Sequence, residues 1–173
     1  MNGVLVVDKP AGMTSHDVVA RVRRVLSERR VGHAGTLDPM ATGVLVVMVG
    51  EATKLAPWLT RDDKRYRATV ELGIATATLD AEGEVTARAP LPAWWTTDEA
   101  EARVAAALAV ERARTEQLPP VFSAIKVAGR PAHARTRAGE EVTLAARRVV
   151  VHAIEVVARG SNTLELELLV SKG

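Results

Sequence analysis

The sequence predicts an α+β fold with a mixed, mostly antiparallel sheet flanked by helices, and three observations support this prediction. Residues 66–72 and 163–170 alternate apolar and polar side chains, which is the pattern of half-buried strands. Residues 15–29 and 98–113 carry apolar side chains at helical spacing. Strands and helices do not alternate regularly along the chain, so the repeated strand–helix–strand unit of parallel sheets is not expected.

The N-terminal part of the chain predicts a strand, a turn and the start of the first helix. Residues 3–8 (GVLVVD) form a short apolar run typical of a buried strand. A proline and a glycine within residues 9–13 then interrupt regular structure. Thr14 or Ser15 can cap the helix that follows. Asp17 stands three residues after Thr14 and completes a pattern resembling a capping box.

The most unusual stretch is residues 31–50 (VGHAGTLDPMATGVLVVMVG). Its glycine-rich first part predicts a constrained loop, and residues 44–49 predict a buried strand. The polar side chains of the loop include the imidazole of His33, the hydroxyl of Thr36 and the carboxylate of Asp38. Spacing alone leaves two interpretations. The commoner is a turn with an incidental acid, and the other is a loop that presents these side chains for chemistry.

The rest of the chain predicts further short elements, with no internal repeat and no low-complexity tract. In order, we expect a short helix at 51–59, a charged turn at 62–65, the strand 66–72, a strand near Val85, the helix 98–113 capped by Thr97 or Asp98, a strand at 121–127, a helical piece at 133–138, a bulged strand at 147–158 and the strand 163–170.

The composition is that of a globular protein. With 173 residues, 47% of them apolar, the chain is one large domain or a domain and part of another. The absence of cysteine excludes disulfides and thiolate metal sites, and the four histidines are too far apart in the sequence to indicate a zinc site. We find no apolar run long enough to span a membrane and no signal-peptide pattern. We therefore expect a cytoplasmic protein without a metal or a membrane partner.

The net charge of +2 is small, but the basic side chains gather in three segments, residues 21–30, 64–67 and 130–137. Brought onto one face, these clusters would form a phosphate-binding surface. Arginine-rich segments are as often solvated faces without a partner, and the charge pattern alone favours neither interpretation.

Several segments together resemble one family. They are VVDKPAGMTS (6–15), GHAGTLDPMATGVL (32–45), GEATK (50–54), DKRY (63–66), QLPPVFSAIK (117–126) and the terminal SKG. In this order, and over essentially the whole chain, they resemble the TruB family of tRNA pseudouridine synthases. The resemblance implies the pseudouridine synthase fold, with residues 1–173 as the N-terminal part of its catalytic domain.

The resemblance also implies an activity and its central residues. Asp38 would be the nucleophile of an isomerase that converts uridine 55 in the T-loop of tRNA to pseudouridine, without cofactor or metal. His33 would contact the RNA where the flipped nucleotide leaves its stack. Tyr66 would pack against the target base. These roles suit the residue types, because a rigidly held carboxylate can act as a nucleophile and aromatic side chains offset the cost of extruding a base.

The partner implied by the resemblance is the T-arm of tRNA, bound by a monomer. Weaker candidates for RNA contacts are Lys9, Lys54, Lys64, Arg130 and Arg137. The last two lie in a segment, residues 126–142, that matches an RNA-gripping insertion of the family. Lys9 and Pro10 belong to a motif that, in the family, mainly supports the active-site loop.

The resemblance further implies residues beyond SKG. In the family the chain continues with TYIR, whose tyrosine and arginine complete the active site, and with a C-terminal RNA-binding domain. We therefore expect a fold incomplete at its C-terminal end, a chain that binds tRNA weakly, and little or no turnover. Two alternatives stay open: a non-catalytic tRNA-binding or RNA-folding module, and the related branch that modifies ribosomal RNA with a guide RNA.

Overall fold

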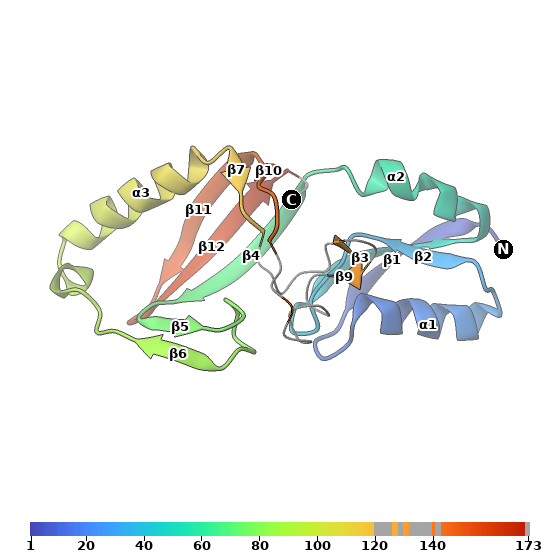
Figure 1. Cartoon of the computed structure of the whole chain (residues 1–173), viewed down its shortest axis with the longest axis horizontal. Helices are drawn as coiled ribbons and strands as arrows, with labels where there is room; N and C mark the ends of the chain where they lie inside the picture. The colour runs from blue at the N-terminus through green and yellow to red at the C-terminus, as the bar shows by residue number, and fades with distance from the viewer. Residues whose placement is uncertain (120–125, 128–129, 132–139, 141–142, 172–173) are drawn as a thin grey trace. The chain divides into compact units, whose positions relative to one another are not determined.

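The computed structural model describes residues 1–119, 126–127, 130–131, 140 and 143–171. The chain divides into two compact units, an N-terminal unit of residues 1–62 and a C-terminal unit of residues 63–173. Each unit has its own sheet and its own core, and each is described by itself (Figure 1).

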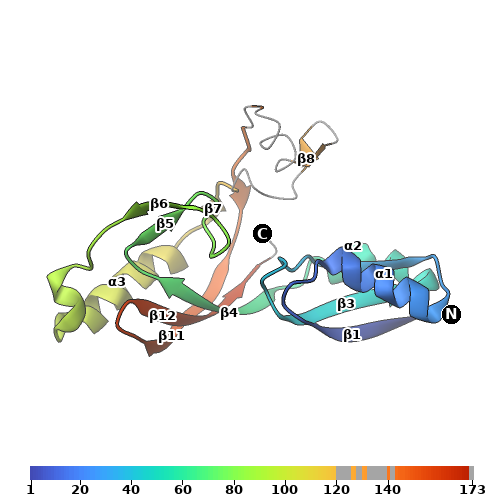
Figure 2. The ribbon, with the colours of Figure 1, turned by 90° about the horizontal axis from the view of Figure 1, so that it is seen from below.

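The N-terminal unit is a three-stranded antiparallel sheet with one face covered by a helix (Figure 2). Its elements are β1 (Gly3–Lys9), α1 (Ser15–Leu26), β2 (Val31–Ala34), β3 (Gly43–Val49), a 3₁₀ helix η1 (Gly50–Leu55) and α2 (Ala56–Leu59), and the strand order is β1-β3-β2. Val18 and Val19 of α1 pack with Leu45, Val47 and Val49 of the central strand. Strand β3 is therefore the strand that the sequence predicts at 44–49, buried at Leu45 and at Val47–Val49 but exposed at Val44.

Helix α1 begins as predicted and ends earlier. Thr14 is its N-cap, and a full capping box is present: Asp17 N–H donates to Thr14 Oγ1, while Thr14 N–H donates to Asp17 Oδ2. The predicted end near residue 29 is wrong, because the helix stops at Leu26. Ser27 takes a left-handed conformation (φ +48°), which closes the helix and turns the chain toward β2.

The capping box predicts a pH dependence of stability. Hydrogen bonds from the Thr14 hydroxyl and backbone N–H lower the pKa of Asp17. Because this pKa is lower in the folded than in the unfolded chain, the contribution of Asp17 is present above about pH 4, the ordinary range of an aspartate, and is lost as the pH falls through the folded-state pKa. We expect Asp17→Asn to unfold at lower urea concentration than the wild type at pH 7, with the difference narrowing below about pH 4.

Urea midpoints at pH 7, 4 and 3 check this expectation. Asp98→Asn is the matched control, because Asp98 precedes helix α3 (Glu99–Arg112) without a capping hydrogen bond from its side chain. If the urea midpoints of the wild type and Asp17→Asn differed by the same amount from pH 7 to pH 3, the capping contribution of the Asp17 carboxylate would be contradicted.

Strand β2 was not predicted. The glycine-rich pattern predicts one loop over residues 32–43. In the structure Val31–Ala34 pair with β3, from Val31 opposite Val49 to Ala34 opposite Val46. Gly32 and His33 have little intrinsic preference for a strand, so the pairing with β3 decides their conformation. As a result, His33 lies on a strand, and the loop between β2 and β3 comprises residues 35–42 only.

The C-terminal unit is built on a second antiparallel sheet, with strand order β11-β12-β4. Its elements are β4 (Lys64–Glu71), β5 (Ile74–Thr76), β6 (Val85–Arg88), a 3₁₀ helix η2 (Ala93–Thr96), α3, β7 (Glu116–Gln117), β8 (Lys126–Val127), β9 (Arg130–Pro131), β10 (Arg147–Arg148), β11 (Val151–Arg159) and β12 (Thr163–Val170). Helix α3 runs along this sheet beside β11 (Figure 1). Val104 of α3 packs with Trp95, Leu164 and Leu166.

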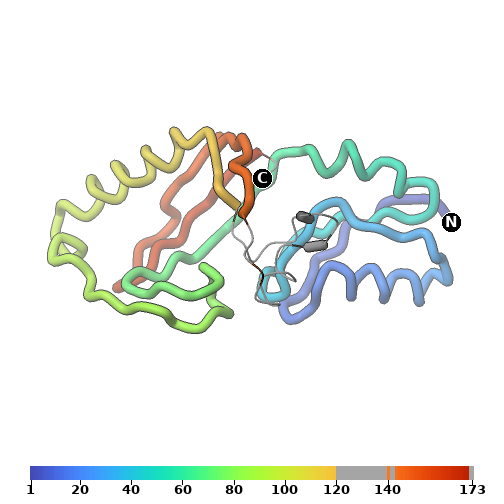
Figure 3. The backbone as a smooth tube through the Cα atoms, viewed as in Figure 1, coloured from blue at the N-terminus to red at the C-terminus, as the bar shows by residue number. Residues whose placement is uncertain are grey.

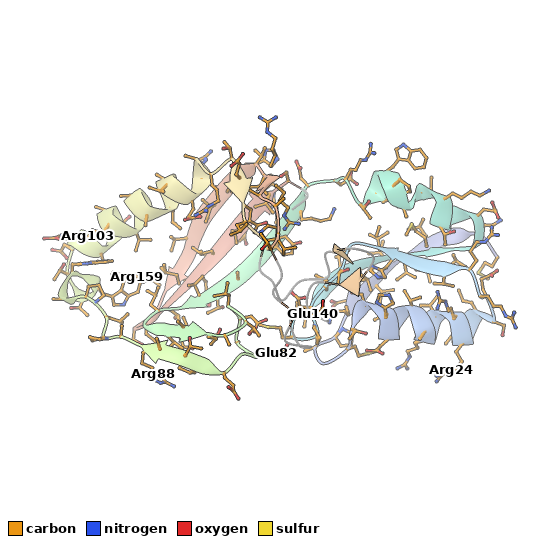
Figure 4. All side chains as sticks on the ribbon, in the orientation of Figure 1. Arg24, Glu82, Arg88, Arg103, Glu140 and Arg159 are labelled. Carbon is orange, nitrogen blue, oxygen red and sulfur yellow. The ribbon has the colours of Figure 1, made fainter. Side chains whose placement is uncertain are left out.

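Trp95 ties the connection before α3 to the sheet. It is 3% exposed, and its Nε1 donates to the carbonyl of Ser161 at 2.6 Å. The guanidinium of Arg159 lies 5.3 Å from the Trp95 ring centroid, and Arg103 lies 5.4 Å from that of Trp94 (both arginines are labelled in Figure 4). These cation–π contacts give Arg103 and Arg159 a structural role, so no RNA contact is needed to explain either position.

Most predicted elements of this unit are confirmed. The strand predicted at 163–170 is β12, the strand predicted at 66–72 is β4, and the bulged strand predicted at 147–158 is β10 followed by β11, with two register shifts against β12. Strand β5 was missed. Of the strand predicted at 121–127, residues 126–127 form β8 and the others lie outside the described residues, as does the helical piece predicted at 133–138. All strand pairs among the described residues are antiparallel, which confirms the α+β class.

Candidate functional site

The loop of residues 35–42 carries Asp38 from β2 to β3, and its backbone path can be followed in Figure 3. The Asp38 side chain is exposed, and it has no hydrogen bond or ion pair with any of the described residues. Its backbone is tied down: the Asp38 carbonyl accepts from Ala41 N–H at 3.1 Å, which closes a turn directly after the acid. The loop therefore presents a free carboxylate on a restrained backbone.

The residue before Asp38 is held by Ser15 at the start of α1. Ser15 Oγ donates to the Leu37 carbonyl at 3.2 Å and accepts from the Leu37 N–H at 3.0 Å. Ser15 is 1% exposed, so neither hydrogen bond competes with bulk water. One buried hydroxyl thus satisfies both backbone groups of Leu37.

The residue after Asp38 is held by the turn that precedes α1. The Pro39 carbonyl accepts from Gly12 N–H at 2.8 Å and from Lys9 Nζ at 3.3 Å. Gly12 has φ +82°, a conformation that favours glycine. Residues on both sides of Asp38 are therefore anchored to one segment, residues 9–15, which we call the anchor segment.

Lys9 is the centre of the anchor segment. Its side chain is fully buried, and Nζ donates to the carbonyls of Pro10 at 2.9 Å, Met13 at 2.7 Å and Pro39. Three N–H donors require the protonated ammonium, and all three are used within the protein. The RNA contact predicted for Lys9 does not fit this position, since the ammonium is enclosed and fully bonded. Lys9 is placed as a support for the loop.

His33 stands at the entrance of the loop. It is half-buried at the end of β2, and its Nδ1 lies 2.5 Å from the carbonyl of Gly35. Gly35 has φ +102°, which turns its carbonyl back toward the ring and which residues other than glycine rarely adopt. The His33 ring also contacts the ring of His16, which lies in α1.

Tyr66 belongs to the C-terminal unit. It lies in β4 opposite Leu168 of β12 and is 44% exposed, so its ring is available at the sheet surface. Lys64 opens the same strand, opposite Val170. Arg130 lies in β9, and Arg137 lies outside the described residues.

Lys54, in η1, is exposed but paired. Its Nζ lies 2.5 Å from Glu51 Oε2, and Arg30 pairs with the other oxygen of the same carboxylate. The hydrogen bond from Lys54 and the nearby Arg30 charge lower the pKa of Glu51. A phosphate that binds Lys54 would have to compete with this carboxylate.

The arginines of α1 and of the turn after it differ in role. Some make hydrogen bonds within the protein, and others face solvent. Arg23 donates to the Val31 carbonyl at 2.8 Å and so fixes the turn into β2. Arg24 (labelled in Figure 4) and Arg29 line a shallow depression at the end of the helix together with Ser27. Arg24 and Arg29 are exposed and can reach an external anion, although the carboxylate of Glu28 lines the same depression.

Two features are absent from the described part of the chain. No group of three or more His, Asp or Glu side chains there is placed to hold a metal ion. No helix there is long and apolar enough to cross a membrane.

The resemblance indicates Asp38 and His33 as site residues and Lys9 as a support of the loop. It assigns no role in the site to the other residues that hold this loop. Gly12 was noted only as a helix breaker and Ser15 only as a possible cap, and His16 was not singled out. Their contacts reach 17 to 27 positions along the chain, so no local pattern could have indicated them. Among local patterns, the capping box points in this direction, because it predicts that α1 starts beside Ser15.

Comparison with known proteins identifies the family of this chain. A family described as "TruB family pseudouridylate synthase (N terminal domain)" matches residues 23–173. A relative from Nocardia farcinica named "tRNA pseudouridine synthase B" is 55% identical over 159 residues, and one of the same name from Thermobifida fusca is 56% identical over 158 residues. These alignments cover 92% and 90% of the chain but 50% and 51% of the relatives. The chain thus spans about half the length of the curated relatives it matches.

Solved structures share the fold. The chain is similar to a chain of the crystal structure of a Cbf5-Nop10-Gar1 complex, with a TM-score of 0.70, 27% identity, and coverage of 99% of this chain and 40% of that chain. A structure of an H/ACA RNP bound to a substrate RNA shares the fold at a TM-score of 0.58 and 24% identity. The match over residues 23–173, together with the relatives at more than 50% identity, shows that the chain belongs to the TruB family of pseudouridylate synthases.

Proposed function

We propose that this chain carries the catalytic nucleophile, Asp38, of an enzyme that isomerises uridine 55 in the T-loop of tRNA to pseudouridine. The observation that supports this most is the double anchoring of the loop around Asp38. Ser15 holds Leu37 and the anchor segment holds Pro39, while the carboxylate between them is exposed. A nucleophile is effective when its position is fixed before the substrate arrives, which is what such anchoring provides.

The reaction needs little else from the protein. The Asp38 carboxylate attacks the target nucleotide, at the sugar or at the base, and the bond between uracil N1 and C1′ of the ribose breaks. The base turns and rejoins C1′ through C5. C5 loses its hydrogen as a proton, N1 gains one, and the carboxylate is released, so the overall change is an isomerisation.

Access to the target requires base flipping. A uridine inside a folded RNA loop has to leave its stack before a carboxylate can reach it, at a cost of a few kcal/mol. We assign His33 to the RNA beside the vacated position and Tyr66 to the extruded base, since stacking on an aromatic ring offsets part of this cost. Basic side chains that face solvent, such as Arg24 and Arg29, would add phosphate contacts.

Two alternatives are weighed against this proposal. The relatives above 50% identity are named as tRNA enzymes, whereas the Cbf5 structure is 27% identical, which favours tRNA over a guided ribosomal substrate. A binding module without catalysis is favoured by one observation: the Asp38 carboxylate has no cationic partner among the described residues. A nucleophile of this kind is commonly stabilised by a nearby cation.

The test compares the chain with a chimera. Because the chain spans about half of its relatives, we would join it to the second half of the Nocardia farcinica protein. We expect the chain alone to bind an unmodified tRNA transcript weakly with little turnover, and the chimera to convert uridine 55. Tritium release from tRNA labelled at uracil C5 measures turnover, and filter binding measures affinity. A chimera that binds tRNA without releasing tritium would favour the binding module.

A further inference from the structure

Two histidines from different elements meet beside the candidate loop. His16 lies in the first turn of α1 and His33 in β2, 17 positions later in the sequence. Their ring centroids are 5.2 Å apart with an interplanar angle of 83°, an edge-to-face contact. This geometry is one of the preferred arrangements of aromatic pairs. The contact involves a residue, His16, that no other part of the proposed site uses.

The His33 ring is restrained a second time by the loop itself. Its Nδ1 lies 2.5 Å from the Gly35 carbonyl. A carbonyl oxygen only accepts, so Nδ1 carries the hydrogen, and in the neutral ring Nε2 is the acceptor. The hydrogen bond determines which ring edge faces Gly35, and the contact with His16 limits the tilt of the ring about that bond. Together they set both the orientation and the plane of His33.

His16 can act as a fixed reference because its own backbone is fixed. The residue before it, Ser15, is bonded to Leu37, and the residue after it, Asp17, completes the capping box with Thr14. The side chain of His16 is exposed, so it contributes little to the core of the unit. Its position beside His33 is therefore not explained by packing.

We propose that His16 is a positioning residue that sets the plane of the His33 ring for stacking against RNA. This inference rests on the proposed function, because it assumes that His33 receives the RNA where a nucleotide is extruded. A ring whose plane is set in the free protein loses less conformational freedom when a base stacks on it. His16 then affects RNA affinity only through His33.

A double-mutant cycle on the 173-residue chain tests this. The probe is an unmodified tRNA transcript, and the readout is its dissociation constant. We expect His16→Ala to weaken binding about threefold to tenfold, the value of one aromatic pair. We expect His33→Ala to weaken it about tenfold or more. The double variant should bind like His33→Ala alone, and His16→Phe, which keeps an aromatic edge, should bind within about twofold of the wild type.

Controls separate positioning from a loss of structure. His152→Ala removes a histidine of the C-terminal unit, whose Nε2 pairs with Asp63, and should leave binding unchanged. In His16→Ala the NMR resonances of the His33 ring protons should move, because the neighbouring ring is removed. Three results would each overturn the inference. They are additive losses of binding free energy in the cycle, a His16→Phe variant that binds tRNA as weakly as His16→Ala, and His33 resonances that do not move. A wild-type chain that does not bind tRNA would count against the proposed function, and the His33 resonances would still decide whether the contact exists.

Discussion

Replacing Asp38 with asparagine is expected to abolish pseudouridine formation while leaving tRNA binding and folding unchanged. The amide is nearly isosteric with the carboxylate but is not a nucleophile, so the covalent step has no substitute, and we expect the rate to fall by about a thousandfold or more. The Asp38 side chain is exposed and has no partner among the described residues. Its replacement should therefore change the free energy of unfolding by no more than about 0.5 kcal/mol.

Single-turnover tritium release, with protein in excess over labelled tRNA, measures this effect on the chain and on the chimera. Asp98→Asn is the control, an equally exposed acid before α3 in the other unit, and it should leave the rate unchanged. Tritium release by Asp38→Asn at a rate within about tenfold of the parent would remove Asp38 from the role of nucleophile. A large loss of tRNA affinity in the same variant would place Asp38 in binding instead.

The second large effect is expected at Lys9, and it is an effect on stability. Lys9→Met keeps most of the side-chain volume but removes the donor shared by the Pro10, Met13 and Pro39 carbonyls. Hydrogen bonds from a charged group contribute about 1.5–3 kcal/mol each, and the three carbonyls would lose the donor that the fully buried Lys9 side chain supplies. We expect the free energy of unfolding to fall by about 3 kcal/mol, together with turnover of the chimera.

Urea unfolding followed by circular dichroism gives the change in stability, and hydrogen exchange at the amides of β3 localises it to the N-terminal unit. Lys54→Met makes the same chemical change at an exposed ion pair with Glu51, and should cost less than about 1 kcal/mol. One outcome would contradict this expectation: Lys9→Met is as stable as Lys54→Met and loses only tRNA affinity. Lys9 would then be an RNA contact, as the resemblance implies.

Local patterns in the sequence were sufficient for most elements. The alternation in 163–170 identifies β12 because a strand with one buried face repeats every two residues. The apolar run at 44–49 identifies β3 because a central strand has a neighbour at each edge and most of its side chains are buried. Thr14 and Asp17 locate the start of α1, since capping chemistry depends on a fixed spacing of three residues.

Features that depend on distant partners could not be predicted in this way. Strand β2 forms on a poor strand sequence because β3 is available to pair with it. The end of α1 is set by a left-handed serine, a residue with no particular preference for that conformation. For the site, the sequence indicates Asp38 and His33 through resemblance. The resemblance also indicates Lys9 as a support of the loop. The partners of Lys9 and Ser15 follow only from contacts with residues 22 to 30 positions away.

The anchor segment has a consequence for how the loop acquires its shape during folding. Contacts between Lys9 and Pro39, and between Ser15 and Leu37, close long stretches of chain, and such closures are made only when the intervening elements are in place. A synthetic peptide of residues 31–50 would contain the whole signature GHAGTLDPMATG, the Ala41–Asp38 hydrogen bond and both strands of the β2–β3 pair, but none of the anchor segment. The conformation of Asp38 is thus a cooperative property of β1, α1 and β3 together, and the short signature does not encode it alone.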